Sequence, residues 1–151
     1  MENSQATIET LNDLITINND RIAGYEKAME ELDGKEKDLT LLFEKMVDES
    51  RDIRNALGRE VQVLGGEMAE GTMAIGKIYR AWMDVRAVFT GHDRHTVLEN
   101  CHTGEHAAQR AYTAALEEKT MPHFLRDMIS TQQRTLQSSH DEIKALTEQT
   151  A

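Results

Sequence analysis

The chain has 151 residues, enough for a single domain, and its 39% hydrophobic and 29% charged residues are typical of a soluble protein. Its net charge of −10 at pH 7 argues against nucleic-acid binding, because phosphate backbones repel such a chain. Its apolar runs are far too short for a membrane span, and the N-terminus does not resemble a secretory signal. With a lone cysteine, Cys101, these features predict a cytoplasmic protein that contacts neither membrane nor nucleic acid.

The first half of the chain predicts a helical hairpin. Helix-forming residues dominate, and proline occurs only at Pro122. Residues 7–32 have apolar side chains every three or four positions, which indicates a helix with one buried face, and Gly34 is suited to end it. Residues 38–64 show the same period up to a pair of glycines. Because the turn between them is short, the two helices should lie antiparallel.

Three more helices are predicted after that hairpin. A shorter one covers residues 72–89, a fourth follows the capping residue Asp93 as far as residue 117, and the last begins at Pro122. Two hairpins joined by a long crossover is the ferritin-like arrangement. We therefore predict an all-α, ferritin-like four-helix bundle with an additional crossover helix between the second and third bundle helices, formed by residues 1–151 as one domain.

Several polar residues fall on the predicted buried faces: Asn18, Ser50, Glu105 and Gln132. Glu105 lies about 30° from the centre of its stripe, and a buried carboxylate is costly unless it meets a cation, a metal or hydrogen-bond donors. Three interpretations stay open. Glu105 binds a metal, or it joins a polar network that fixes the helix register, with those residues or an arginine such as Arg54 as its partners. The third is that Glu105 is exposed and does not lie on the buried face.

The metal interpretation has four candidate ligands. Glu105 and His140 are the main ones, and Glu49 or His102 would assist them. Glu49 lies at the edge of the second helix's stripe, and His140 is about one turn further along the bundle than Glu105. Iron, manganese and zinc are the candidate ions. The pattern identifies no catalytic residue and no small-molecule ligand.

A histidine-rich ridge lies on the fourth predicted helix, away from its buried stripe. His95, Glu99, His102 and His106 follow one another at intervals of four, three and four residues. Imidazoles at this spacing can share a Zn²⁺ or a similar ion. The alternative is a face, solvated or covered by the crossover helix, that happens to be rich in histidine. Cys101, on the buried stripe, is interpreted as a small core residue and not as a nucleophile.

The sequence also resembles a known family. The residues that carry the resemblance are Leu11-Asn-Asp-Leu-Ile15, Gly24-Tyr25-x-x-Ala28, Gly71-x-x-x-x-Gly76 with Arg80-x-Trp82, Cys101-x-x-Gly104-Glu105 with Tyr112 and Leu116, and His140-x-x-Ile143. Together they resemble an uncharacterised bacterial ferritin-like family, a domain of unknown function, which implies the same fold. Classical ferritin-like di-iron proteins carry Glu on two helices and Glu-x-x-His on the other two. This chain departs from that pattern, with Asn18 on its first helix and no Glu three residues before His140.

Two classes of function follow from these patterns. The first is a non-enzymatic stress-related or interaction protein with a structural buried polar layer, and the incomplete ligand set favours it. The second is a metal-binding redox bundle, with a di-metal carboxylate or single-metal site. Met83 and Val88 lie off the crossover helix's main stripe and predict an interface, so we expect a homodimer or a higher homo-oligomer.

Overall fold

The computed structural model describes residues 2–69 and 93–149, and within these ranges it is entirely helical, with no strand. The four helices are α1 (Glu2–Leu32), α2 (Lys37–Val63), α4 (Arg94–Leu116) and α5 (His123–Gln149). This confirms the predicted all-helical class and the four long helices. The predicted crossover helix over residues 72–89 lies outside the described residues, as do Met83 and Val88. None of the helices described is both long enough and apolar enough to cross a membrane.

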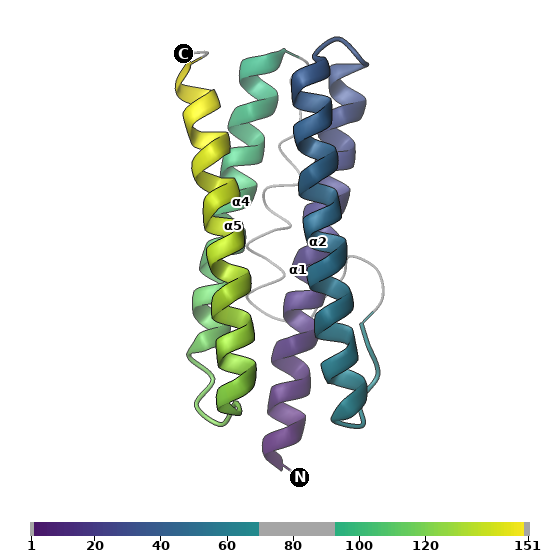
Figure 1. Cartoon of the computed structure of the whole chain (residues 1–151), viewed down its shortest axis with the longest axis vertical. Helices are drawn as coiled ribbons and strands as arrows, with labels where there is room; N and C mark the ends of the chain where they lie inside the picture. Colours follow the sequence, from purple (N-terminus) through teal and green to yellow (C-terminus); the bar gives the residue numbers. More distant parts are fainter. Residues whose placement is uncertain (1, 70–92, 150–151) are drawn as a thin grey trace.

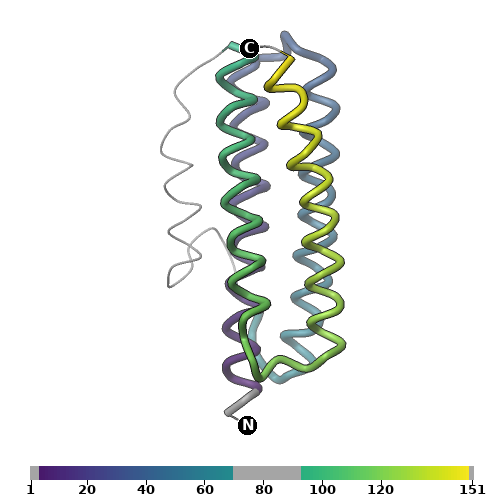
Figure 2. The backbone as a smooth tube through the Cα atoms, turned by 90° about the vertical axis from the view of Figure 1, so that its left-hand side faces the viewer, coloured from purple at the N-terminus to yellow at the C-terminus, as the bar shows by residue number. Residues whose placement is uncertain are grey.

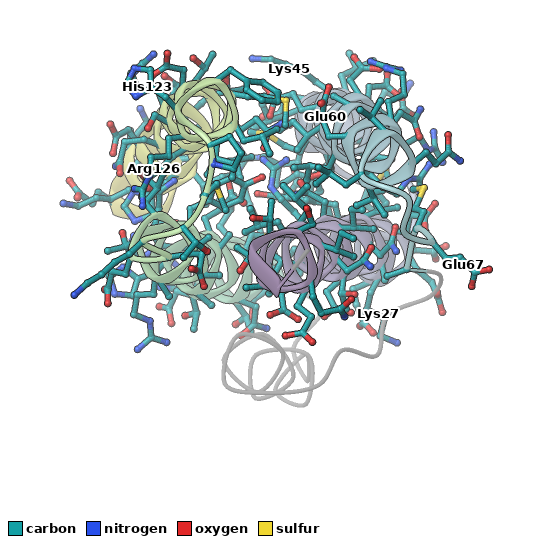
Figure 3. The ribbon with its side chains drawn as sticks, turned by 90° about the horizontal axis from the view of Figure 1, so that it is seen from below. Lys27, Lys45, Glu60, Glu67, His123 and Arg126 are labelled. Atoms are coloured by element: carbon teal, nitrogen blue, oxygen red, sulfur yellow. The ribbon has the colours of Figure 1, made fainter. Side chains whose placement is uncertain are left out.

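The four helices form a bundle with one helix at each corner (Figure 3). α1 packs against α2 and α4, and α4 packs against α5. α1 and α2 form one antiparallel hairpin, and α4 and α5 form the other (Figure 1). α1 and α5 run upward in Figure 1 while α2 and α4 run downward, so the end of α2 and the start of α4 lie at opposite ends of the bundle; Figure 2 gives the same order from the side.

Local sequence explains where the helices begin and end. The turn after α1 places Asp33 and Gly34 at φ values of 52° and 74°, a left-handed conformation that glycine adopts at little cost. Asp93 caps α4 as predicted, since its Oδ1 accepts a 2.9 Å hydrogen bond from the Thr96 N–H. Arg126 of α5 donates from Nη1 to the Leu116 carbonyl at 2.7 Å and thereby ties the second turn to the end of α4.

The apolar core has two main parts, with polar residues at the level between them. The part near the α4–α5 turn includes Leu11, Ile15, Leu57, Val61, Leu125 and Ile129. The part near the α1–α2 turn includes Ile22, Leu32, Phe43, Met46, Leu98 and Ile143. A small group of Ile17, Ala107, Ala108 and Ala111 fills the contact between α1 and α4, where alanines let the two helices approach closely. Charged side chains such as Lys45 and Glu67 lie on the outside (Figure 3).

Candidate functional site

Arg21 of α1 lies at the centre of the polar level and is completely buried. Its Nε donates to Glu105 Oε1 at 2.6 Å. Its Nη1 donates to the Met46 carbonyl at 3.0 Å and to Ser50 Oγ at 2.8 Å. Its Nη2 donates to Glu105 Oε2 at 3.1 Å and to Glu49 Oε1 at 3.3 Å. A guanidinium group has five N–H donors, so all of them have an oxygen partner here.

The Arg21–Glu105 contact is a bidentate salt bridge in which neither side chain is more than 1% exposed. Burial is the largest single effect and would lower the pKa of Arg21, but the charge and hydrogen bond of Glu105, together with smaller contributions from Tyr25 and Glu49, outweigh it. The pKa of Arg21 is therefore raised above its ordinary value, and the guanidinium stays charged. The Tyr25 ring also lies 5.3 Å below the guanidinium carbon, in cation–π range.

The hydrogen bonds continue from Ser50 towards the other end of the bundle. Ser50 Oγ donates to Asn18 Oδ1 at 2.9 Å, and Asn18 Nδ2 donates to Tyr112 Oη at 3.0 Å. Tyr112 Oη in turn donates to Gln132 Oε1 at 3.1 Å. Asn18, Ser50 and Tyr112 are fully buried, and Gln132 is only 7% exposed. These residues come from α1, α2, α4 and α5, so the chain of hydrogen bonds joins all four described helices.

A second branch leads from Arg21 through Glu49 to another residue of α5. Ser139 Oγ of α5 donates to Glu49 Oε1 at 2.8 Å, the same oxygen that accepts from Arg21. This branch links α2 directly to α5. We call the set Asn18, Arg21, Glu49, Ser50, Glu105, Tyr112, Gln132 and Ser139 the polar layer.

The structure brings together the four inward polar residues that the sequence identified. The arginine that pairs with Glu105, however, is Arg21 and not Arg54. Asn18, Ser50, Glu105 and Gln132 all belong to the polar layer. Arg54 does not reach it, because its Nη1 donates to Asn19 Oδ1 at 3.2 Å on the side of α1. The partner of Glu105 is Arg21. A signal for this exists in the sequence, since Arg21 is three residues after Asn18 and four before Tyr25 on the buried stripe.

The four predicted metal ligands fall into two groups. Glu105 and Glu49 share Arg21. His102 of α4 and His140 of α5 face each other, with ring centroids 4.8 Å apart. Within residues 2–69 and 93–149, no set of three or more His, Cys, Asp or Glu side chains is already arranged around one metal position. The assignment of a metal to these four residues stays a prediction.

The histidine ridge of α4 divides into two parts. His95 pairs with Glu99 four residues later. His106, exposed on α4, lies with its ring centroid 6.1 Å from that of His140, so His102 and His106 both neighbour the same residue of α5. Burial lowers the pKa of His102, and the neighbouring His140 and His106 lower it further. We call His102, His106 and His140 the histidine cluster.

Cys101 lies on the inward face of α4, where it is only 5% exposed. Burial raises its pKa above the ordinary value, so the thiol stays protonated at neutral pH. A protonated, buried thiol is a poor nucleophile, and the structure agrees with a packing role for this residue.

A family described as "Domain of unknown function (DUF2383)" matches residues 6–118, from the first turns of α1 to just beyond the end of α4. The chain belongs to this family. The matched range contains Arg21, Glu49, Ser50, Glu105 and Tyr112, and therefore most of the polar layer, together with His102 and His106. No curated protein matches the chain. The match confirms the expected membership of a domain family of unknown function.

Proposed function

We propose that this protein is a non-enzymatic, ferritin-like helical bundle of the cytoplasm, a stress-related or interaction protein whose polar layer serves the fold. Its biological contacts are then made by its outer surface and by association with copies of itself, as a homodimer or a higher homo-oligomer. The observation that carries the proposal is the complete satisfaction of Arg21 by oxygens of its own chain.

The chemistry of the layer supports a structural role. In ferritin-like di-iron proteins the inward carboxylates are neutralised by metal ions. Here Glu105 and Glu49 meet the guanidinium of Arg21, which supplies the positive charge from within the chain. A buried ion pair of this kind adds little net stability compared with apolar packing, but wrong helix registers leave its charges unpaired. The layer thus selects one arrangement of the four helices.

The directions of the helices support the ferritin-like assignment. The end of α2 and the start of α4 lie at opposite ends of the bundle (Figure 1), whereas each hairpin closes with a short turn. A 27-residue helix such as α2 is about 40 Å long, and a connection between those two ends must cover about that distance. One long crossover between two hairpins is the connectivity of ferritin-like folds.

The role of Glu105 can be tested with a charge-removing variant of similar shape. Wild-type protein and Glu105→Gln, both purified without an affinity tag, are analysed for iron, manganese and zinc per chain. If the carboxylate belongs to a structural layer, the variant has the same metal content as the wild type. Stoichiometric iron or manganese in the wild type that is lost in Glu105→Gln would overturn the structural role and favour a redox bundle.

Self-association has its own test. The expectation rests on Met83 and Val88 in the sequence, which lie off the apolar stripe predicted for residues 72–89. Sedimentation at tens of micromolar protein should give a dimer or a larger species. A monomer of 17.1 kDa under these conditions would contradict it.

A further inference from the structure

Two histidines on α4 are spaced to chelate a metal. His102 and His106 are four residues apart, which places both imidazoles on one face of the helix, one turn above the other. The same spacing of two histidines on one helix face is used by zinc sites in metalloproteases. His102 is half-buried and His106 is exposed, whereas Glu105 between them points into the core. The pair therefore lies outside the polar layer, although it is on the same helix.

The third imidazole comes from α5. The ring of His140 lies 4.8 Å from that of His102 and 6.1 Å from that of His106, centroid to centroid. A metal ion bonded to two imidazole nitrogens at about 2.0–2.1 Å holds the ring centres about 5 Å apart. The distance between the His102 and His140 rings already matches this value. The distance between the His106 and His140 rings exceeds it by about 1 Å, which a side-chain rotation of the exposed His106 can remove.

The hydrogen bonds leave the required nitrogens available. His140 Nδ1 lies 3.2 Å from Asp141 Oδ1 and 3.4 Å from Gln137 Nε2. When the Asp141 carboxylate accepts the hydrogen bond of a protonated Nδ1, the lone pair of the ring is on Nε2. His102 Nε2 is buried and has no hydrogen-bond partner in the part of the chain that the structure describes. A buried polar nitrogen without a partner is costly, and a ligand that bonds to it removes this cost.

We propose that His102, His106 and His140 bind one Zn²⁺ or a similar late first-row divalent ion across the α4–α5 seam, with Asp141 orienting His140. Imidazole nitrogen suits ions of this group, and three protein ligands leave a fourth position open. A metal-bound histidine commonly gives its other ring nitrogen to a carboxylate, as Asp141 provides here. Neutral imidazole is the ligating form.

The test is calorimetric titration of the tag-free, metal-stripped chain with Zn²⁺. The wild type should bind one ion per chain and melt at a higher temperature with zinc than without it. His106→Gln and His140→Gln should each weaken binding by about 100-fold, because two histidines remain. Asp141→Asn should weaken it by about tenfold, as expected for a residue that orients a ligand. His106 is exposed, so His106→Gln tests the site without disturbing the core.

His123→Gln is the matched control, because His123 is an exposed histidine on α5 with a carboxylate, Asp127, four residues later. It should bind zinc like the wild type. The site is overturned if His123→Gln weakens binding as much as His140→Gln does, or if the wild type takes up no zinc at micromolar concentrations. One zinc per two chains, accompanied by zinc-dependent dimerisation in sedimentation, would also overturn it, since the histidines would then bridge copies.

Discussion

On α4, Glu105 of the polar layer lies between His102 and His106 of the histidine cluster. The two sets of residues differ in how their polar atoms are used. In the polar layer every N–H of Arg21 meets an oxygen of the chain. In the histidine cluster the rings pack against one another, and the Nε2 atom of His102 has no hydrogen-bond partner among the described residues. A buried charge with a full set of partners stabilises one fold, whereas an unpaired nitrogen near the surface is available to a ligand.

The largest expected effect comes from removing the arginine of the polar layer. Arg21→Met keeps much of the side-chain volume but leaves the buried carboxylate of Glu105 without its cation. Removing one partner of a buried ion pair costs about 3–5 kcal/mol, so chemical denaturation should show a loss of this order in the free energy of unfolding.

A double variant separates the ion pair from simple packing. Arg21→Met combined with Glu105→Gln removes both charges, and we expect it to be more stable than Arg21→Met alone. Zinc binding should change little in either variant once the chain is folded, because the histidine cluster does not use Arg21. If the changes in the free energy of unfolding caused by the two substitutions simply added up, the two charges would not be coupled, and the polar layer would have no energetic basis.

The two inward tyrosines give a smaller, internally controlled effect. Tyr112→Phe removes the hydroxyl that accepts from Asn18 and donates to Gln132, and should lower the free energy of unfolding by about 2 kcal/mol. Tyr25→Phe is the matched control. The Tyr25 hydroxyl is buried without a hydrogen-bond partner in the described part of the chain, so its removal should leave stability unchanged or slightly raised. Equal losses in the two variants, measured by thermal unfolding, would contradict the continuous hydrogen-bond chain.

The smallest effect concerns a carboxylate that lies beside another acid instead of a cation. Burial, and then the charge of Glu9, raise the pKa of Asp13 from 3.8 to about 6. Because the folded pKa is above the unfolded one, ionised Asp13 destabilises the fold above about pH 6, and this penalty disappears as the pH falls towards 4. Asp13 is half-buried, so solvent screening reduces the penalty to about 1 kcal/mol.

Asp13→Asn should therefore be about 1 kcal/mol more stable than the wild type above about pH 7, with no difference near pH 4. The measurement is the free energy of unfolding of both proteins across this pH range. If Asp13→Asn were just as much more stable than the wild type at about pH 4 as at about pH 7, the titration of Asp13 would not be the cause of the added stability.

The local sequence alone determined most of the helical framework. The recurrence of apolar residues at three and four positions identified the four long helices, and Gly34 and Asp93 marked a helix end and a helix start that the structure confirms. The same periodicity placed Asn18, Ser50, Glu105 and Gln132 on inward faces, because which side of a helix a residue occupies depends only on its position along that helix.

The pairing between helices was decided by the tertiary structure. Periodicity could not choose between Arg21 and Arg54 as the partner of Glu105, since a long arginine side chain reaches whatever the neighbouring helices bring within its range. It also could not show that His140 of α5 faces His102 and His106 of α4, because that contact depends on how the second hairpin closes. Helix formation follows from neighbours along the chain, whereas both sites are made of residues that only packing brings together.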